Sequence, residues 1–184
     1  MKVKGNQIKA RIILIKNEYG EKVFEKILNS LPEEDQEIFR GIILSGSWFT
    51  FEATNRLDKA IIKTTGVKKN DLYFKLGRSI AKETLNGVHR NFMVPLEPLA
   101  FIKKVNLIYR FYYDSGHREW EPETSNSVYI STLDANTYSE GNCLTNVGYF
   151  TEGLEMCGAK NVKFVKKKCR EKGDKHCRHH VSWT

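Results

Sequence analysis

The sequence predicts an α+β fold in which a helical layer packs on a small, mostly antiparallel sheet. Over residues 1–114, apolar residues recur at intervals of three and four, the period of an amphipathic helix. After Asp114-Ser115-Gly116 the period becomes two, as in a half-buried strand, and a single further helical pattern interrupts the strands. No linker or low-complexity segment divides the 184 residues. We therefore expect one domain, 1–184, mainly helical over 1–114 and with strands around one inserted helix over 115–184.

The helical part is expected to contain several separate helices. Apolar stripes predict helices over residues 8–15 and 24–31, the second ended by Pro32, and a short one near 38–43. Longer helices are expected over 51–65 and 71–86, where Asn70 is a suitable N-cap and Gly87 follows the end. Pro95 and Pro98 then introduce one helix that carries Phe101 and Tyr112 on its apolar face.

The later part of the chain alternates in the manner of strands. Strands are expected over 117–121, 127–133, 161–168 and 176–183. Between the second and third, Cys143, Val147, Phe150, Leu154 and Cys157 repeat at steps of four and three, which predicts one buried helical face. Gly158 is placed to end that helix.

Composition restricts the classes of protein. No apolar run approaches the ~20 residues that span a bilayer, and the first residues lack a signal-peptide pattern, so we expect a cytoplasmic protein. The formal net charge is +8, and many of its lysines lie between Lys160 and Lys172. Lysines there are typical of a protected edge strand. A surface for phosphate or nucleic acid is the alternative, although no helix-turn-helix accompanies it.

Three cysteines form the most informative pattern. Cys169 and Cys177 flank a basic segment whose Gly173-Asp174 predicts a hairpin turn, and Cys143 starts the inserted helix. The three sulfur atoms are therefore expected near one point. Three interpretations stay open: metal ligation, thiols retained by packing, and a redox switch in which the helix N-terminus lowers the pKa of Cys143.

The C-terminal residues carry a resemblance to a known superfamily. Residues 149–162 (YFTEGLEMCGAKNV), then Cys169, Gly173, Cys177 and the closing Val181-Ser182-Trp183, resemble the ligand-binding superfamily of 4-vinyl reductase domains, vesicle-tethering TRAPP subunits and haem nitric-oxide-binding domains. Within it, the whole chain is most similar to an uncharacterised bacterial family of the 4-vinyl reductase and TRAPP-subunit type, through Leu31-Pro32-Glu33-Glu34-Asp35 and Gly87-Val88-His89-Arg90.

The resemblance implies zinc as a candidate cofactor. Phenol-sensing relatives hold zinc with three cysteines and a glutamate, and Cys143, Cys169 and Cys177 occupy the matching positions. Lys166 stands where the glutamate is expected, and an ammonium group cannot bind zinc. Glu140, His176 and His179 are possible substitutes, whereas Cys157 lies about 21 Å along the helix from Cys143.

The same resemblance implies a ligand pocket between helices and sheet. The candidate lining residues are aromatic, with a few polar groups: Trp48, Phe51, His89, Tyr112, Trp120, Tyr149 and Phe150, together with His117. Aromatic residues at such spacings also serve as ordinary core. The haem-domain Tyr-x-Ser-x-Arg motif and a Cys-x-x-Cys-His attachment sequence are both absent, and the sequence thus argues against haem.

These observations favour a non-enzymatic module that binds or senses a small hydrophobic molecule, lipid-like or phenol-like, as a homodimer through its helical layer. No catalytic triad, phosphate loop or dinucleotide motif supports an enzyme. The alternative function is an assembly adaptor or a basic regulatory protein that associates with nucleic acid.

Overall fold

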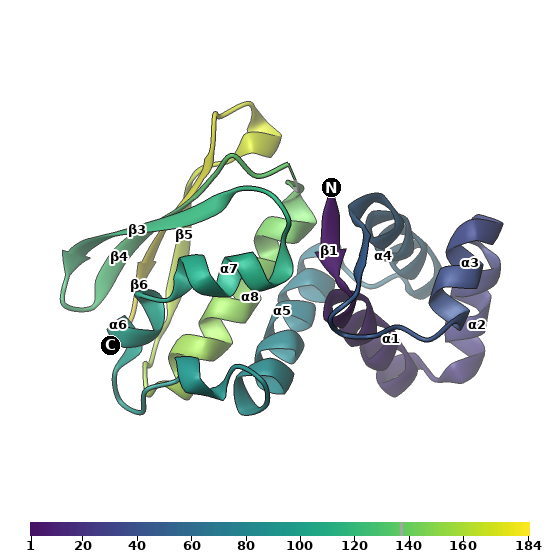
Figure 1. Cartoon of the computed structure of the whole chain (residues 1–184), viewed down its shortest axis with the longest axis horizontal. Helices are drawn as coiled ribbons and strands as arrows, with labels where there is room; N and C mark the ends of the chain where they lie inside the picture. Colours follow the sequence, from purple (N-terminus) through teal and green to yellow (C-terminus); the bar gives the residue numbers. More distant parts are fainter. Residues whose placement is uncertain (137) are drawn as a thin grey trace. The chain divides into compact units, whose positions relative to one another are not determined.

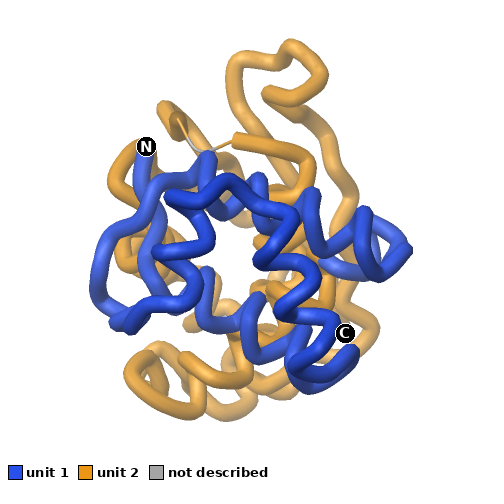
Figure 2. Tube along the Cα trace, turned by 90° about the vertical axis from the view of Figure 1, so that its right-hand side faces the viewer, with its two compact units in different colours: residues 1–72 blue, residues 73–184 orange. Residues whose placement is uncertain are grey.

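The structure is a computed structural model that describes residues 1–136 and 138–184 (Figure 1). The chain divides into two compact units, Met1–Leu72 and Tyr73–Thr184, which Figure 2 colours separately. The α+β class is confirmed, with eight α-helices and six strands in the described residues. The single-domain organisation of residues 1–184 stays a prediction.

The first unit is mainly helical. Its elements are β1 (Lys2–Lys4), α1 (Gly5–Tyr19), α2 (Glu21–Asn29), α3 (Glu33–Arg40), β2 (Trp48–Thr50) and α4 (Phe51–Thr65). The two short strands, which the sequence did not predict, pair antiparallel with Val3 opposite Phe49. Helix α4 has the predicted bounds, because the Thr50 side chain accepts a hydrogen bond from the Ala53 amide and Gly66 ends the helix at φ +71°.

A buried ion pair lies inside the first unit. Arg11 on α1 and Asp58 on α4 are both almost fully buried, and the guanidinium donates from Nε (2.6 Å) and Nη2 (3.0 Å) to the two carboxylate oxygens. The pair joins two helices that are in contact and that both bury apolar residues, Ile8 on α1 and Leu57 and Ile61 on α4. Pairing of both oxygens satisfies a carboxylate that would otherwise be costly to bury.

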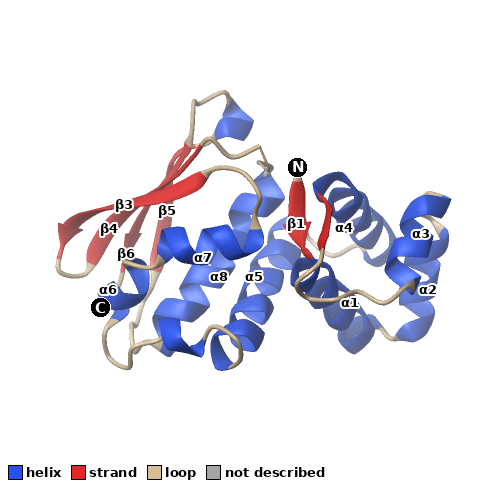
Figure 3. Ribbon diagram, viewed as in Figure 1, coloured by secondary structure: helices blue, strands red, loops and turns tan. Residues whose placement is uncertain are grey.

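The second unit contains helices and a four-stranded sheet (Figure 3). Its helices are α5 (Lys69–Asn86, which starts just before the unit), α6 (Pro98–Ile102), α7 (Val105–Tyr112) and α8 (Glu140–Met156). Its strands are β3 (His117–Thr124), β4 (Ser127–Leu133), β5 (Lys163–Lys168) and β6 (Cys177–Ser182). The strand order is β3-β4-β6-β5, every pairing is antiparallel, and α7 and α8 lie along one side of the sheet (Figure 1).

Two helical predictions are wrong in detail. The helix expected after Pro98 is divided into α6 and α7, and the Lys104 ammonium at the break donates to the carbonyl groups of Asn91 and Phe92 (3.1 and 3.2 Å). Asn70 is not an N-cap, because α5 already begins at Lys69 and the Leu72 amide donates to the Lys68 carbonyl.

Glycines allow α5 and α8 to approach closely. A Cβ atom at Gly77 would overlap the backbone of Thr145 and Tyr149, and one at Gly148 would overlap the backbone of Phe74. The two helices therefore meet backbone to backbone, which fixes the position of α8 within the unit.

The predicted hairpin is confirmed. A short 3₁₀ turn (Arg170–Lys172) and Gly173, at φ +95°, connect β5 to β6. Asp174 closes the turn by accepting a hydrogen bond from the Cys169 amide (2.7 Å). None of the helices in the described part of the chain combines the length and hydropathy needed to cross a bilayer.

Candidate functional site

A cavity lies within the second unit, between the sheet and α8. The space left between its walls is small, with a cavity volume of about 30 Å³. Its apolar walls include Ile130, Val147, Phe150 and Phe164. Its polar lining includes Arg118, Asn142, Cys143, Arg170, Cys177 and His179. A lining that combines apolar walls with a few polar groups is typical of small-molecule sites.

Arg118 supplies a buried positive charge to this cavity. It lies opposite Thr132 in the β3–β4 ladder and is 5% exposed. Its Nε donates to the Thr132 hydroxyl (3.2 Å), and the guanidinium stacks over the rings of Tyr109 (4.8 Å) and Phe150 (5.0 Å). Burial lowers the pKa of Arg118 from its ordinary value. Among the described residues, no carboxylate pairs with it.

His179 supplies an unpaired imidazole nitrogen. It lies on β6 opposite Ile130 and Lys166, and its ring contacts Phe164 edge-on. Burial, with smaller contributions from the charges of Lys166 and Arg118, lowers the pKa of His179 to about 4, so the ring is neutral at pH 7. Its Nε2 is buried and has no hydrogen-bond partner in the described chain.

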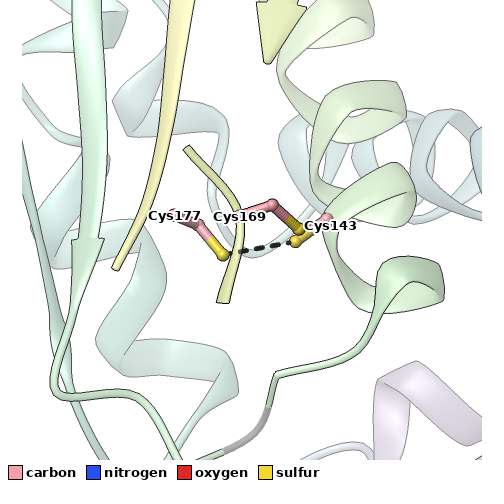
Figure 4. A group of neighbouring side chains, drawn as sticks. All are labelled: Cys143, Cys169 and Cys177. Carbon is pink, nitrogen blue, oxygen red and sulfur yellow. Dashed lines mark hydrogen bonds between the residues drawn. The ribbon is translucent and has the colours of Figure 1, made fainter. Parts of the chain in front are cut away.

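The sulfur atoms of the three cysteines lie close together, as the sequence predicts (Figure 4). The Sγ atoms of Cys143, Cys169 and Cys177 lie within 4.8 Å of one another, and all three residues are buried. The Cys143 and Cys177 thiols share a hydrogen bond (3.6 Å), and the Arg170 amide donates to Cys177 Sγ (3.4 Å).

The two cysteines that share this hydrogen bond differ in acidity. The contact with Cys177 and burial raise the pKa of Cys143, while the same contact lowers the pKa of Cys177 to about 6. The expected lowering of the Cys143 pKa by the helix N-terminus is therefore wrong, because burial and a neighbouring sulfur dominate there.

The predicted pocket residues are distributed over both units. Phe150 lines the cavity, and Tyr149 packs against it (ring centroids 5.6 Å apart). The Tyr112 hydroxyl forms hydrogen bonds with the hydroxyl groups of Thr84 and Tyr149. His89 lies among Phe92, Phe111 and Tyr112, where burial lowers its pKa.

The other predicted pocket residues do not line this cavity. Trp120 is half-buried on β3, and His117 faces Glu119 and Asp134. Trp48 and Phe51 belong to the first unit, where the Lys4 ammonium stacks on Trp48. The shared role of the seven aromatic and histidine residues as one pocket stays a prediction.

The sequence analysis did not identify Arg118 as a functional residue. One signal was available: Arg118 and Trp120 are two residues apart on a predicted strand, so they share a face. An arginine on the apolar face of a strand is uncommon, and that position marks it as a candidate.

Comparisons with known proteins identify the fold. No sequence-family model matches the chain, and no curated protein matches it. An Fe(II) unliganded H-NOX protein from K. algicida has 15% identity and a TM-score of 0.78, with 98% of this chain and 96% of that one covered. An H-NOX protein from S. oneidensis in the Fe(II)NO ligation state has 11% identity and a TM-score of 0.73, with coverages of 98% and 99%.

A third structure, from work on haem redox potential and porphyrin distortion, has 12% identity and a TM-score of 0.71, with coverages of 98% and 95%. At these identities the likeness establishes the fold alone.

The comparisons correct the sequence resemblance. The expected assignment to the 4-vinyl reductase and TRAPP-subunit type is wrong, since the solved structures that match the chain over nearly its whole length are H-NOX proteins. The C-terminal residues that suggested the assignment form the second half of α8 and the β5–β6 hairpin.

The expected cofactors are also corrected. The argument against haem relied on absent short motifs, yet the matching structures include proteins described by Fe(II) ligation, haem and porphyrin. Zinc as the candidate cofactor fails for a structural reason. The three thiols form a group that no described histidine, aspartate or glutamate joins, so Glu140, His176 and His179 do not supply the fourth ligand.

Proposed function

We propose that this chain is a non-enzymatic sensing module that binds a small molecule in the cavity between the β3–β6 sheet and α8. One observation carries the proposal: the cavity combines apolar walls with two buried polar groups, Arg118 and His179 Nε2, that the chain leaves incompletely paired. Buried polar groups without partners are rare in folded proteins, and a functional role is one of the explanations for them.

Haem is the first ligand to test, because the H-NOX structures that share this fold are described with Fe(II) and haem. One donor in the cavity suits such a group: His179 Nε2 has no partner among the described residues, and an imidazole nitrogen is a common axial ligand of haem iron. At a cavity volume of about 30 Å³, haem would enter only if side chains of the walls move aside. Bound haem would supply an iron centre to which a diatomic gas can bind. The residues of this chain would supply the imidazole, a buried cation and the apolar walls.

The test compares hemin with a neutral phenol as probes of the purified chain. Visible spectra and thermal midpoints are measured for the unmodified chain, Val147→Phe, which narrows the cavity, and Val88→Phe, a matched change at a position 82% exposed. We expect at least one probe to bind saturably near one equivalent to the unmodified chain and to Val88→Phe. Val147→Phe should lose that binding.

The histidine is tested separately with His179→Ala. If His179 holds hemin, this variant changes the visible spectrum of the hemin complex while phenol binding continues. Binding of neither probe, or equal binding by Val147→Phe and Val88→Phe, contradicts the proposed site.

A homodimer and a cytoplasmic location belong to the same proposal. The location is supported by the finding that none of the described helices could cross a bilayer. Light scattering at micromolar concentration measures the mass directly, and a mass of one chain contradicts the dimer.

A further inference from the structure

No carboxylate among the described residues pairs with the guanidinium of Arg118. Its exposure is 5%, and its described contacts are one hydroxyl group and the faces of two rings. A buried cation is costly unless an anion pairs with it. Ring faces recover only part of that cost.

Three acidic residues of β3 are engaged on the other face of the sheet. Glu119, the immediate neighbour of Arg118, lies 3.4 Å from the His117 ring. Glu121 holds Arg178 (2.8 Å), and Glu123 holds His180 (2.6 Å). Because side chains alternate along β3, these glutamates point away from the face that Arg118 occupies.

The charged side chains that line the cavity are two arginines. No described aspartate or glutamate lines it, whereas Arg118 and Arg170 both do. The sulfur atom of Cys177 is already engaged by Cys143 and by the Arg170 amide. An anion entering from solvent would therefore meet two guanidinium groups and no opposing carboxylate.

A second polar group in the cavity also lacks a partner among the described residues. His179 Nε2 lines the same cavity without a partner, and a neutral imidazole can donate a hydrogen bond from that nitrogen. Ile130, Val147, Phe150 and Phe164 offer apolar surface to the remainder of a ligand.

We propose, on the basis of the proposed binding function, that the cavity selects a small organic acid. Its carboxylate pairs with the Arg118 guanidinium and accepts a hydrogen bond from His179, and its apolar or aromatic body packs on the walls. The planar fork of arginine suits a carboxylate, and a charged hydrogen bond in a cavity of low polarity is stronger than one in water.

The experiment uses benzoate as the acid and benzamide as its uncharged counterpart of the same shape. Calorimetric titration is applied to the unmodified chain, Arg118→Met, Arg118→Lys and the control Arg178→Met, which removes an arginine whose partner is Glu121. Methionine keeps the apolar stem without the charge and removes an unpaired buried cation, so Arg118→Met is expected to fold at least as stably.

The unmodified chain and Arg178→Met should bind benzoate about tenfold or more tightly than benzamide, because a charged hydrogen bond is lost with the amide. Arg118→Met should lose this preference, and Arg118→Lys should keep part of it. Equal binding of the two probes by the unmodified chain overturns the inference, as does an unchanged preference in Arg118→Met. If phenol or hemin still binds in those cases, the proposed sensing site survives and the preference for an acid alone fails. If no probe binds, both fail.

Discussion

Asp58 shows how the first unit depends on one charged side chain. Its carboxylate is buried and accepts two hydrogen bonds from Arg11. Asp58→Asn should lower the free energy of unfolding by about 3–5 kcal/mol, because a buried guanidinium then loses its counter-charge. Chemical denaturation measures this change.

Two controls define that result. Glu25→Gln breaks the pair with Arg40, whose two side chains are each 42% exposed, and should cost at most about 1 kcal/mol. The double change Arg11→Met with Asp58→Leu should cost less than Asp58→Asn alone, since no charge is left unpaired. A cost for Asp58→Asn as small as that of Glu25→Gln would show that the pair contributes little.

The sequence predicted the cysteines of the site better than its charged groups. Cys169 and Cys177 could be placed together because the turn residues between them define a hairpin. Arg118 and the unpaired His179 nitrogen could not be found this way, because their lack of partners is a property of the packed interior. Whether these two groups find partners depends on how the strands pair with one another and how the sheet packs against α8.

Among the elements, the crossing of α5 and α8 is the most sensitive to a small change. Gly77→Ala should destabilise the second unit by about 1–3 kcal/mol, because the new methyl group overlaps the Thr145 carbonyl. Alanine is the better helix former, so this loss would occur against its intrinsic preference. Thermal unfolding checks the prediction.

Gly46→Ala is the matched control, because a Cβ atom at Gly46 meets nothing within 4 Å. Its stability should change by no more than about 0.5 kcal/mol. If Gly77→Ala proves as harmless as Gly46→Ala, the two helices do not meet as closely as the structure indicates.

The accuracy of the element predictions followed the strength of local signals. The strand Ser127–Leu133 alternates clearly and lies where the sequence predicts it. The strands β1 and β2 have only three residues each, and pairing between distant segments creates them. The break between α6 and α7 depends on tertiary hydrogen bonds of Lys104, which apolar spacing does not reveal.

At the scale of the molecule, the sequence predicted the α+β class because the apolar period changes from helical to strand-like after residue 116 and returns to the helical period only in the inserted helix. It did not predict the H-NOX fold, which structures only 11–15% identical share with this chain. At such identity, the placement of apolar residues preserves the fold. Short motifs that accompany a particular cofactor are therefore a poor guide to the fold.

The expectation of one domain gives a prediction for the whole molecule. Fluorine-labelled tryptophan reports each unit separately, since Trp48 lies in the first unit and Trp120 and Trp183 in the second. In a urea titration, all three resonances should change with the same midpoint, as expected for a two-state domain. Separate midpoints would show that Met1–Leu72 and Tyr73–Thr184 unfold independently.

The outer strand β5 has a consequence for how copies of the chain can meet. Within the described residues it pairs with β6 alone. It carries Lys163, Lys166, Lys167 and Lys168, and its register shifts between Lys166 and Lys168. Two such strands brought side by side would oppose lysine to lysine along an irregular backbone, so a sheet continuing from one copy into the next is disfavoured. Self-association through this border should therefore be absent even at high concentration, and a symmetric pair has to form over another surface.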